Sequence, residues 1–292
     1  MAFARPRTKG LREGGAVPGR AARCLRPGLA GLLVAVLASD VAAAAACGGE
    51  AGEAARVAAV LEAGDLRLED GRTIRLAGVV ADIGQPGQAA ALRDELERRV
   101  AGRAVQLFPV GAADRYGRQA AYLVPGETAG PTLQEQLLLA GLALWRPGEA
   151  AGACRETLTM AEAVAARARR GVWRLFPLPA RNPAAVARFE GRYAVVAGRV
   201  LSSGETRQRD YLNFGPVWRK DFTVEIPAGA RPGFVRAGKE PQRLVMGDVA
   251  VRGVVFEAGG PAIEARLPEQ VERLATGREA GADEGRAEAV ER

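Results

Sequence analysis

Short segments of alternating apolar and polar residues, separated by glycine and proline, run through most of this chain. Residues 66–68 alternate, Asp70-Gly71 is a strong turn signal, and residues 73–80 alternate again, which predicts a β-hairpin. With 37 glycines and 17 prolines among 292 residues, the chain has turns available between many such strands. Short strands of this kind bury their apolar faces by curling into small barrels, so we expect a mainly β architecture.

Helical patterns interrupt these strands in the first half of the chain. Residues 85–100 carry an apolar stripe of Ala90, Leu92, Leu96 and Val100. Pro131 stands in the first turn of a second apolar segment, and residues 154–170 form a third that ends before Gly171. We therefore expect an α+β domain over residues 56–176, a closed barrel of the OB type with helices on its flank.

The second half is expected to be almost wholly β. The proline-rich residues 177–188 predict a rigid linker, and a further domain follows over residues 189–275. Five strand-like segments lie there, at residues 192–201, 210–214, 220–226, 248–257 and 262–266. They favour a second small β-barrel, again OB-like. Residues 276–292 are glycine, alanine and charged residues with few apolar ones, which predicts a disordered tail.

The first 46 residues have the pattern of an export signal. A basic stretch precedes an apolar run at residues 29–37, and a tract of small residues ends at Ala46. The run is shorter than the ~20 apolar residues that a spanning helix needs, so we expect no membrane span after signal removal. The exported chain would then begin with a linker, residues 47–55, in the periplasm or outside the cell. A lipoprotein anchor at Cys47 is the alternative.

Most of the positive charge belongs to this signal. The net charge is +7, and before Cys47 seven Lys and Arg stand against two Asp and Glu, which is +5 of that total. The remaining +2 is too small to indicate nucleic-acid binding from bulk charge.

Histidine and cysteine usage narrows the chemistry. The chain has no histidine, which excludes a Ser-His-Asp triad, a Cys-His pair and a His-ligated zinc site. Of three cysteines, Cys24 leaves with the signal, so Cys47 and Cys154 are predicted to form a disulfide in an oxidising compartment. Two unpaired thiols are the alternative.

Three blocks of the first domain carry a family resemblance. They are Glu62-Ala63-Gly64-Asp65-Leu66-Arg67-Leu68, Ile74-Arg75-Leu76-Ala77-Gly78-Val79-Val80-Ala81-Asp82-Ile83 and Asp114-Arg115-Tyr116-Gly117-Arg118. In this order, over roughly residues 56–174, they resemble the staphylococcal nuclease (thermonuclease) family. In that family a calcium ion held by carboxylates polarises a phosphodiester, a glutamate activates water, and two arginines stabilise the transition state.

The resemblance implies which groups remain here. It places the two arginines at Arg75 and Arg118, with Tyr116 and Asp114 supporting phosphate binding. The family's acidic positions fall instead on Gly64, Val80 and Ile83. Asp65 and Asp82 stand beside these positions and would ligate Ca²⁺ only if the loops were shifted. We therefore expect phosphodiester hydrolysis to be weak or absent.

Aromatic and basic residues interleave in the second domain. Tyr211, Trp218, Arg219 and Lys220 would suit a face for single-stranded nucleic acid, with stacking surfaces beside phosphate partners. Alternation alone also predicts that the aromatic residues form the core and the arginines its solvated face.

The leading hypothesis is an exported protein of the thermonuclease family that binds nucleic acid or another phosphate-bearing ligand through Arg75 and Arg118. Two alternatives stay open. One is a non-enzymatic periplasmic scaffold with a protein partner, and the other is an active calcium-dependent nuclease that uses Asp65 and Asp82.

Overall fold

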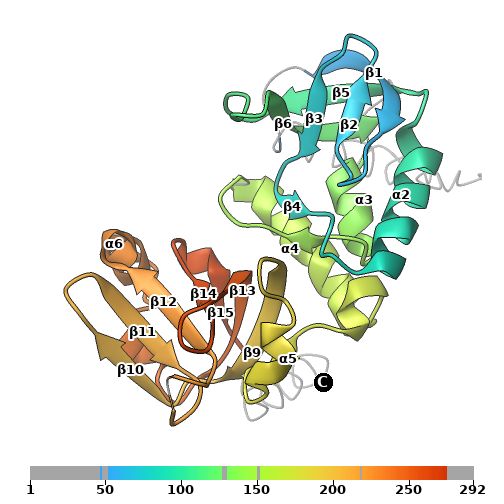
Figure 1. Cartoon of the computed structure of the whole chain (residues 1–292). Helices are drawn as coiled ribbons and strands as arrows, with labels where there is room; N and C mark the ends of the chain where they lie inside the picture. Colours follow the sequence, from blue (N-terminus) through green and yellow to red (C-terminus); the bar gives the residue numbers. More distant parts are fainter. Residues whose placement is uncertain (1–46, 48–51, 127–129, 150–151, 218, 275–292) are drawn as a thin grey trace, which may run out of the picture.

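A computed structural model describes residue 47 and residues 52–126, 130–149, 152–217 and 219–274 of the chain. These form two β-rich domains joined by helices (Figure 1). The expected export signal and tail lie outside the described residues. Among the described helices, none has the length and apolar character to cross a membrane.

The first domain is built on a closed barrel of five strands in the order β1-β2-β3-β6-β5. The strands are β1 (Glu53–Val60), β2 (Leu66–Leu68), β3 (Thr73–Leu76), β5 (Ala104–Pro109) and β6 (Arg118–Pro125). The predicted hairpin is confirmed, since β2 pairs antiparallel with β3 and Gly71 has a φ of 86° that suits glycine. β1 begins at Glu53, so the segment expected as a linker up to residue 55 already belongs to the barrel.

Three helices cover this barrel, namely α2 (Pro86–Val100), α3 (Leu133–Leu139) and α4 (Gly152–Arg167). Leu92, Leu96 and Val100 of α2 are buried as expected, whereas Ala90 faces solvent. α4 ends at Arg167, earlier than predicted. The chain reverses through Arg169, which has a φ of 49°, while Arg170 N–H bonds the Ala165 carbonyl.

A short two-stranded sheet and one turn of helix complete the first domain. β4 (Val79–Val80) pairs with β7 (Leu144–Trp145), and η1 (Gly171–Arg174) follows α4. The predicted disulfide is confirmed, because Cys47 and Cys154 are bonded with Cα atoms 4.7 Å apart. It attaches Cys47 to α4.

The second domain is one eight-stranded sheet. Its strands are β8 (Leu178–Pro179), β9 (Tyr193–Arg199), β10 (Ser202–Glu205), β11 (Arg209–Asn213), β12 (Thr223–Pro227), β13 (Asp248–Glu257), β14 (Pro261–Glu264) and β15 (Val271–Arg273). Seven run in the order β10-β11-β12-β14-β13-β9-β8, and β15 pairs with β13. We expected a second small β-barrel here, and the strand path found is an open one. β8 is only two residues long and contains Pro179, which suits an edge rather than closure.

Short helices pack against this sheet. The segment expected as a linker, residues 177–188, belongs to the second domain. β8 pairs in parallel with β9, and α5 (Pro183–Ala187) follows with Val186 buried. Two further helices, α6 (Arg231–Arg236) and α7 (Pro241–Leu244), bury Phe234 and Leu244 against the sheet.

Buried polar contacts fix the two domains against each other. Arg252 on β13 pairs with Glu162 on α4 at 2.8 Å and donates to the Trp145 carbonyl at 3.1 Å. The Tyr193 hydroxyl donates to the same carbonyl, also at 3.1 Å. Trp173 of the first domain belongs to the same buried apolar cluster as the core of the second. A buried charged pair tolerates little displacement, so these contacts favour one arrangement of the two domains.

Candidate functional site

The two predicted arginines meet in one cavity at an end of the barrel. β3 and β6 run in parallel, with Thr73 opposite Arg118 and Arg75 opposite Ala120. The cavity, of about 300 Å³, is lined by side chains that include Asp65, Arg75, Val80, Asp82, Arg118 and Arg146. The structure therefore brings together both predicted arginines and both predicted acids, and it adds Arg146, which the sequence pattern did not single out.

Arg118 is oriented by the turn that precedes it. Its Nε donates to Asp114 Oδ2 at 2.9 Å, and its Nη1 donates to Asp65 Oδ2 at 3.1 Å. Asp114 also accepts the backbone N–H groups of Tyr116 and Arg118. The Arg118 N–H is the main reason why the pKa of Asp114 lies below its ordinary value. Asp114 thus shapes the turn and aims the guanidinium toward Asp65.

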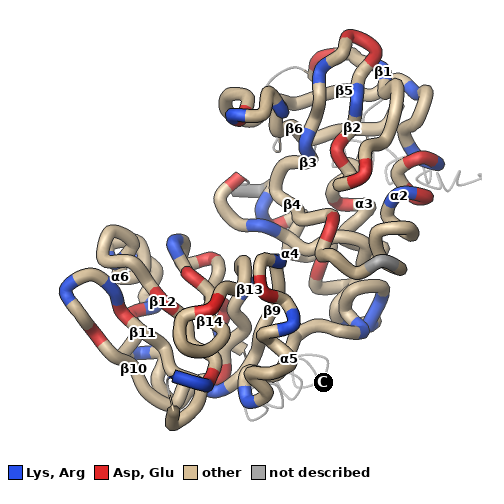
Figure 2. Tube along the Cα trace, viewed as in Figure 1, with Lys and Arg blue, Asp and Glu red and all other residues tan. Residues whose placement is uncertain are grey.

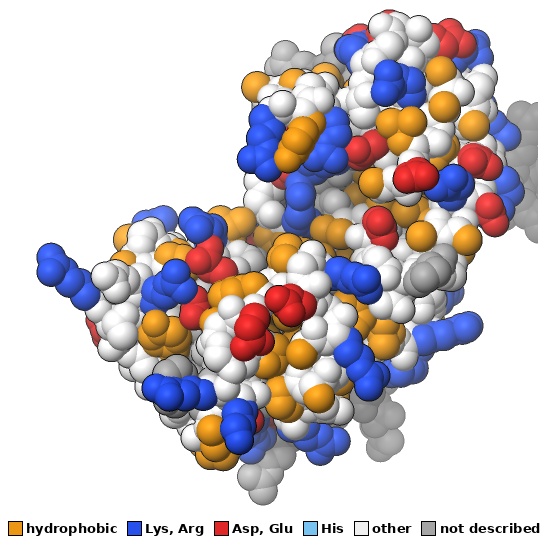
Figure 3. Space-filling model, viewed as in Figure 1, with side chains coloured by type: hydrophobic (Ala, Val, Ile, Leu, Met, Phe, Trp, Pro, Cys, Tyr) orange, Lys and Arg blue, Asp and Glu red, His pale blue; other side chains and the backbone are white. Residues whose placement is uncertain are grey.

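Tyr116 lies outside the cavity. Its side chain is 68% exposed, and its ring lies 5.5 Å from the Arg118 guanidinium carbon and 4.8 Å from that of Arg115. Basic side chains beside this turn border the hollow between the domains on the face shown in Figure 3. The position of Tyr116 suits contact with a ligand at the rim rather than within the cavity.

Arg75 is held by a carboxylate that the sequence analysis missed. Its Nη2 donates to Glu149 Oε1 at 2.6 Å and its Nη1 to Oε2 at 3.1 Å, a two-pronged pair. Glu149 also accepts the Gly78 N–H at 2.7 Å and pairs with Arg146. No periodic pattern marked Glu149, because it stands in a turn after β7 and 74 positions from Arg75.

The surroundings of Glu149 keep it charged. Burial acts to raise its pKa, but the hydrogen bonds from Arg75 and the Gly78 N–H and the charge of Arg146 outweigh that effect. The pKa of Glu149 therefore lies below its ordinary value of 4.5.

Residues 74–175 match the family described as staphylococcal nuclease homologue. This chain carries a staphylococcal-nuclease-like domain. The match runs over 102 of 292 residues and includes both predicted arginines, Arg146 and Glu149. Asp65 precedes it, and the second domain follows it. A comparison with curated proteins gives no match.

The nuclease-like domain lacks a donor set for calcium in its described residues. Ile83 is 1% exposed within the core, and Val80 places a branched apolar side chain at the cavity wall. Asp65 is bound to Arg118, and Asp82 accepts the Gly84 N–H at 2.7 Å. The described part of the chain holds no group of three or more His, Cys, Asp or Glu arranged for a metal. Calcium takes about 6–8 oxygen ligands, several of them carboxylate, so these residues do not fit it.

The residues predicted to contact nucleic acid in the second domain are spread over different places. Tyr211, half-buried on β11, lines a separate hollow with Asn213 and Thr223, while Arg219 and Lys220 are exposed in the loop before β12. Trp218 lies outside the described residues. Two further aromatic residues of this segment, Phe214 and Phe222, are buried with ring centroids 5.1 Å apart. Nucleic-acid contact by the other four stays a prediction.

Proposed function

We propose that this protein binds the phosphodiester backbone of nucleic acid at the cavity of its nuclease-like domain, and that calcium-dependent hydrolysis is weak or absent. One observation carries the proposal. Arg75, Arg118 and Arg146 line a single cavity, and apolar Val80 stands in its wall at a position that the family resemblance assigns to an acid.

The ion pairs of these arginines leave room for an anion. A guanidinium has five N–H donors. Arg75 gives two nitrogens to Glu149, and Arg118 gives donors to Asp114 and Asp65. The carboxylates orient both guanidinium groups, so a phosphate that approaches the remaining donors pays a smaller entropic cost for ordering the side chains. Basic and acidic residues are interspersed along the described parts of both domains (Figure 2). The preference for anions therefore arises in the cavity and not from a broad basic face.

The arrangement supports binding better than turnover. A general base must lie within hydrogen-bond reach of an attacking water, and losing one costs about 10²–10⁴ in rate. Glu149 is engaged by two arginines and a backbone N–H, and Asp65 by Arg118. Asp82 is the other carboxylate that lines the cavity, and it accepts the Gly84 N–H.

We also propose that the protein works outside the cytoplasm. The basic, apolar and small-residue pattern of residues 1–46 supports this, and so does a Cys47–Cys154 disulfide, since such bonds persist in oxidising compartments.

Fluorescence anisotropy with a labelled 12-nucleotide oligothymidylate tests the binding. We expect affinity to fall as salt rises and Arg118→Ala to weaken binding about tenfold, because a charge-assisted hydrogen-bond donor is lost. Arg118→Lys should recover only part of the loss, since lysine lacks the fork. The matched control is Arg103→Ala, which removes an exposed arginine that does not line the cavity.

The catalytic part is tested separately with single-stranded DNA and calcium. We expect no cleavage above the level of the Arg118→Ala variant. Calcium-dependent product that disappears in Asp65→Asn or Asp82→Asn would show an active metal site and refute that part of the proposal. Absence of binding at every salt concentration would instead favour the scaffold alternative.

A further inference from the structure

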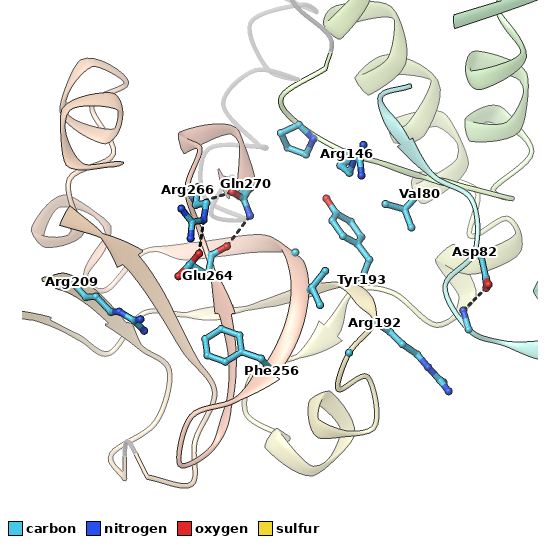
Figure 4. A pocket seen from close by; sticks show the side chains of 15 residues that line it. Val80, Asp82, Arg146, Arg192, Tyr193, Arg209, Phe256, Glu264, Arg266 and Gln270 are labelled. Carbon is cyan, nitrogen blue, oxygen red and sulfur yellow. Dashed lines mark hydrogen bonds and ion pairs between the residues drawn. The ribbon is translucent and has the colours of Figure 1, made fainter. Parts of the chain in front are cut away.

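A larger cleft, of about 880 Å³, lies between the two domains (Figure 4). The nuclease-like domain contributes Val80, Asp82 and Arg146 to its wall. The second domain contributes residues of β9, β11, β13 and β14, among them Arg192, Arg209, Val254, Phe256 and Glu264, with Arg192 just before β9. Neither domain alone forms this cleft.

The cleft adjoins the arginine cavity. Val80, Asp82 and Arg146 line both hollows, so the two share a wall and meet at those side chains. A chain-like ligand with one phosphate beside Arg118 could therefore continue past Arg146 toward the second domain.

We propose that the interdomain cleft binds the continuation of a single-stranded nucleic acid, one phosphate of which lies in the arginine cavity. This inference rests on the proposed function and assigns the second domain a part in it. The strand passes from the nuclease-like domain to the second domain, with Arg146 and Arg192 contacting successive parts of its backbone.

The charges in the cleft favour a polyanion. Four arginines line it, Arg146, Arg192, Arg209 and Arg266, against the carboxylates of Asp82 and Glu264. Three of these arginines pair with carboxylates, namely Glu149, Glu225 and Glu264. Arg192 is exposed and has no ion pair within the described ranges, and its side chain lies over Gly84 of the other domain. Of the arginines that line the cleft, Arg192 thus has the most N–H donors available to bind a phosphate.

Apolar surface beside these cations favours an unpaired strand over a duplex. Val254 is 53% exposed, and the partly exposed Phe256 lies on the same strand two residues later. Unpaired bases offer flat apolar faces to such side chains. A duplex keeps its bases stacked inside and would leave both residues facing water.

A hydrogen bond between the domains lies next to both Arg146 and Arg192 in the sequence. Arg146 follows Trp145, and Arg192 precedes Tyr193, whose hydroxyl donates to the Trp145 carbonyl across the interface at 3.1 Å. Each arginine backbone is also bonded within its own domain, Arg146 N–H to the Gly78 carbonyl and Arg192 to Phe189 and Val255, so the hydrogen bond across the interface joins two ordered segments. A preformed site binds without the cost of closing two domains.

The test measures how affinity depends on strand length. Oligothymidylates of two to twelve nucleotides are titrated against the chain by anisotropy over a range of salt. We expect affinity to rise with length and Arg192→Ala to weaken the 12-mer about fivefold, with the salt slope smaller by about 0.7. The dinucleotide should be unaffected, and Arg192→Lys should keep most of the affinity. Arg188→Ala, which removes an exposed arginine outside the cleft, is the matched control and should change nothing.

The outcomes separate this inference from the proposed function. If Arg118→Ala weakens the 12-mer while Arg192→Ala leaves affinity and length dependence unchanged, the cleft is refuted and the cavity stands. If neither variant changes binding, both are refuted. If a duplex binds as tightly as the single strand and with the same Arg192 dependence, the cleft binds backbone without regard to bases, and the single-strand assignment is wrong. Unchanged melting of Arg192→Ala confirms that the variant is folded.

Discussion

Glu162 is the residue whose removal should most disturb the joint between the domains. Its Oε1 accepts the Trp145 N–H at 2.8 Å, and its Oε2 accepts from Arg252 at 2.8 Å. Both charged side chains are only 6% exposed. Glu162→Ala therefore leaves a buried backbone N–H without its acceptor and a buried guanidinium without its close carboxylate, with Glu272 at 3.9 Å as the nearest remaining charge partner.

The expected loss follows from those two orphaned groups. Breaking one side of a buried ion pair costs about 3–5 kcal/mol, and an unsatisfied buried N–H costs about 1–3 kcal/mol. The two costs belong to one network and do not add fully. Arg252 also keeps its bond to the Trp145 carbonyl. We expect the free energy of unfolding to fall by about 4 kcal/mol.

Urea unfolding followed by tryptophan fluorescence measures this change, since Trp145 and Trp173 lie at the joint. Glu162→Leu combined with Arg252→Met removes both charges, and such replacements are often neutral or stabilising, so the double variant should recover most of the loss. Glu97→Ala removes an exposed glutamate on α2 and should stay within about 0.5 kcal/mol of the parent. The reasoning would be refuted if Glu162→Ala lowered the free energy of unfolding by less than about 1 kcal/mol. It would also be refuted if the double variant lost as much stability as the sum of the losses of the two single variants.

Three further outcomes are expected. Glu149→Gln should lower the free energy of unfolding by about 1–2 kcal/mol at pH 7. Because the pKa of Glu149 is depressed below 4.5 in the folded state, this difference should be full above pH 4.5 and should vanish as pH falls through the folded pKa, which urea titrations at several pH values will show. Cys47→Ser removes the Cys47–Cys154 disulfide, which joins residues 107 positions apart. The free energy of unfolding, measured by thermal unfolding, should fall by about 4–5 kcal/mol, and a reductant should have no further effect on the variant. Gly141→Ala places a Cβ 2.4 Å from the Arg170 carbonyl oxygen at a φ of 69° and should cost more than about 2 kcal/mol, whereas Gly126→Ala, also at positive φ but with open space, should cost only about 1 kcal/mol.

Features that depend on neighbouring residues were predictable. Asp70-Gly71 turns the hairpin because only a few residues suit that backbone shape, and Leu92, Leu96 and Val100 point inward because their spacing matches a helix. The end of α4 was misjudged because Gly171 suggested a cap, whereas its closeness to Gly141 is what requires a glycine there.

The site was only partly predictable, for a related reason. The family resemblance singled out Arg75 and Arg118, and the pairing of β3 with β6 brings both to one cavity. No local sequence pattern pointed to Glu149, because its contact with Arg75 forms only when the chain folds back 74 positions later. Arg146 likewise enters the site only through the pairing of β7 with β4.

Turns, amphipathic stripes and strand alternation depend on residues that are only a few positions apart in the sequence. These local patterns were sufficient to indicate a small barrel with helices on its flank. The ion-pair partner of a charged residue cannot be identified from such local patterns. Arg252 and Glu162 are 90 positions apart and nothing in their neighbouring residues indicates that they pair, yet their ion pair is one of the buried contacts that join the domains beside the cleft. A buried charge takes whichever partner the packed surfaces bring to it, so only the tertiary structure could decide that contact.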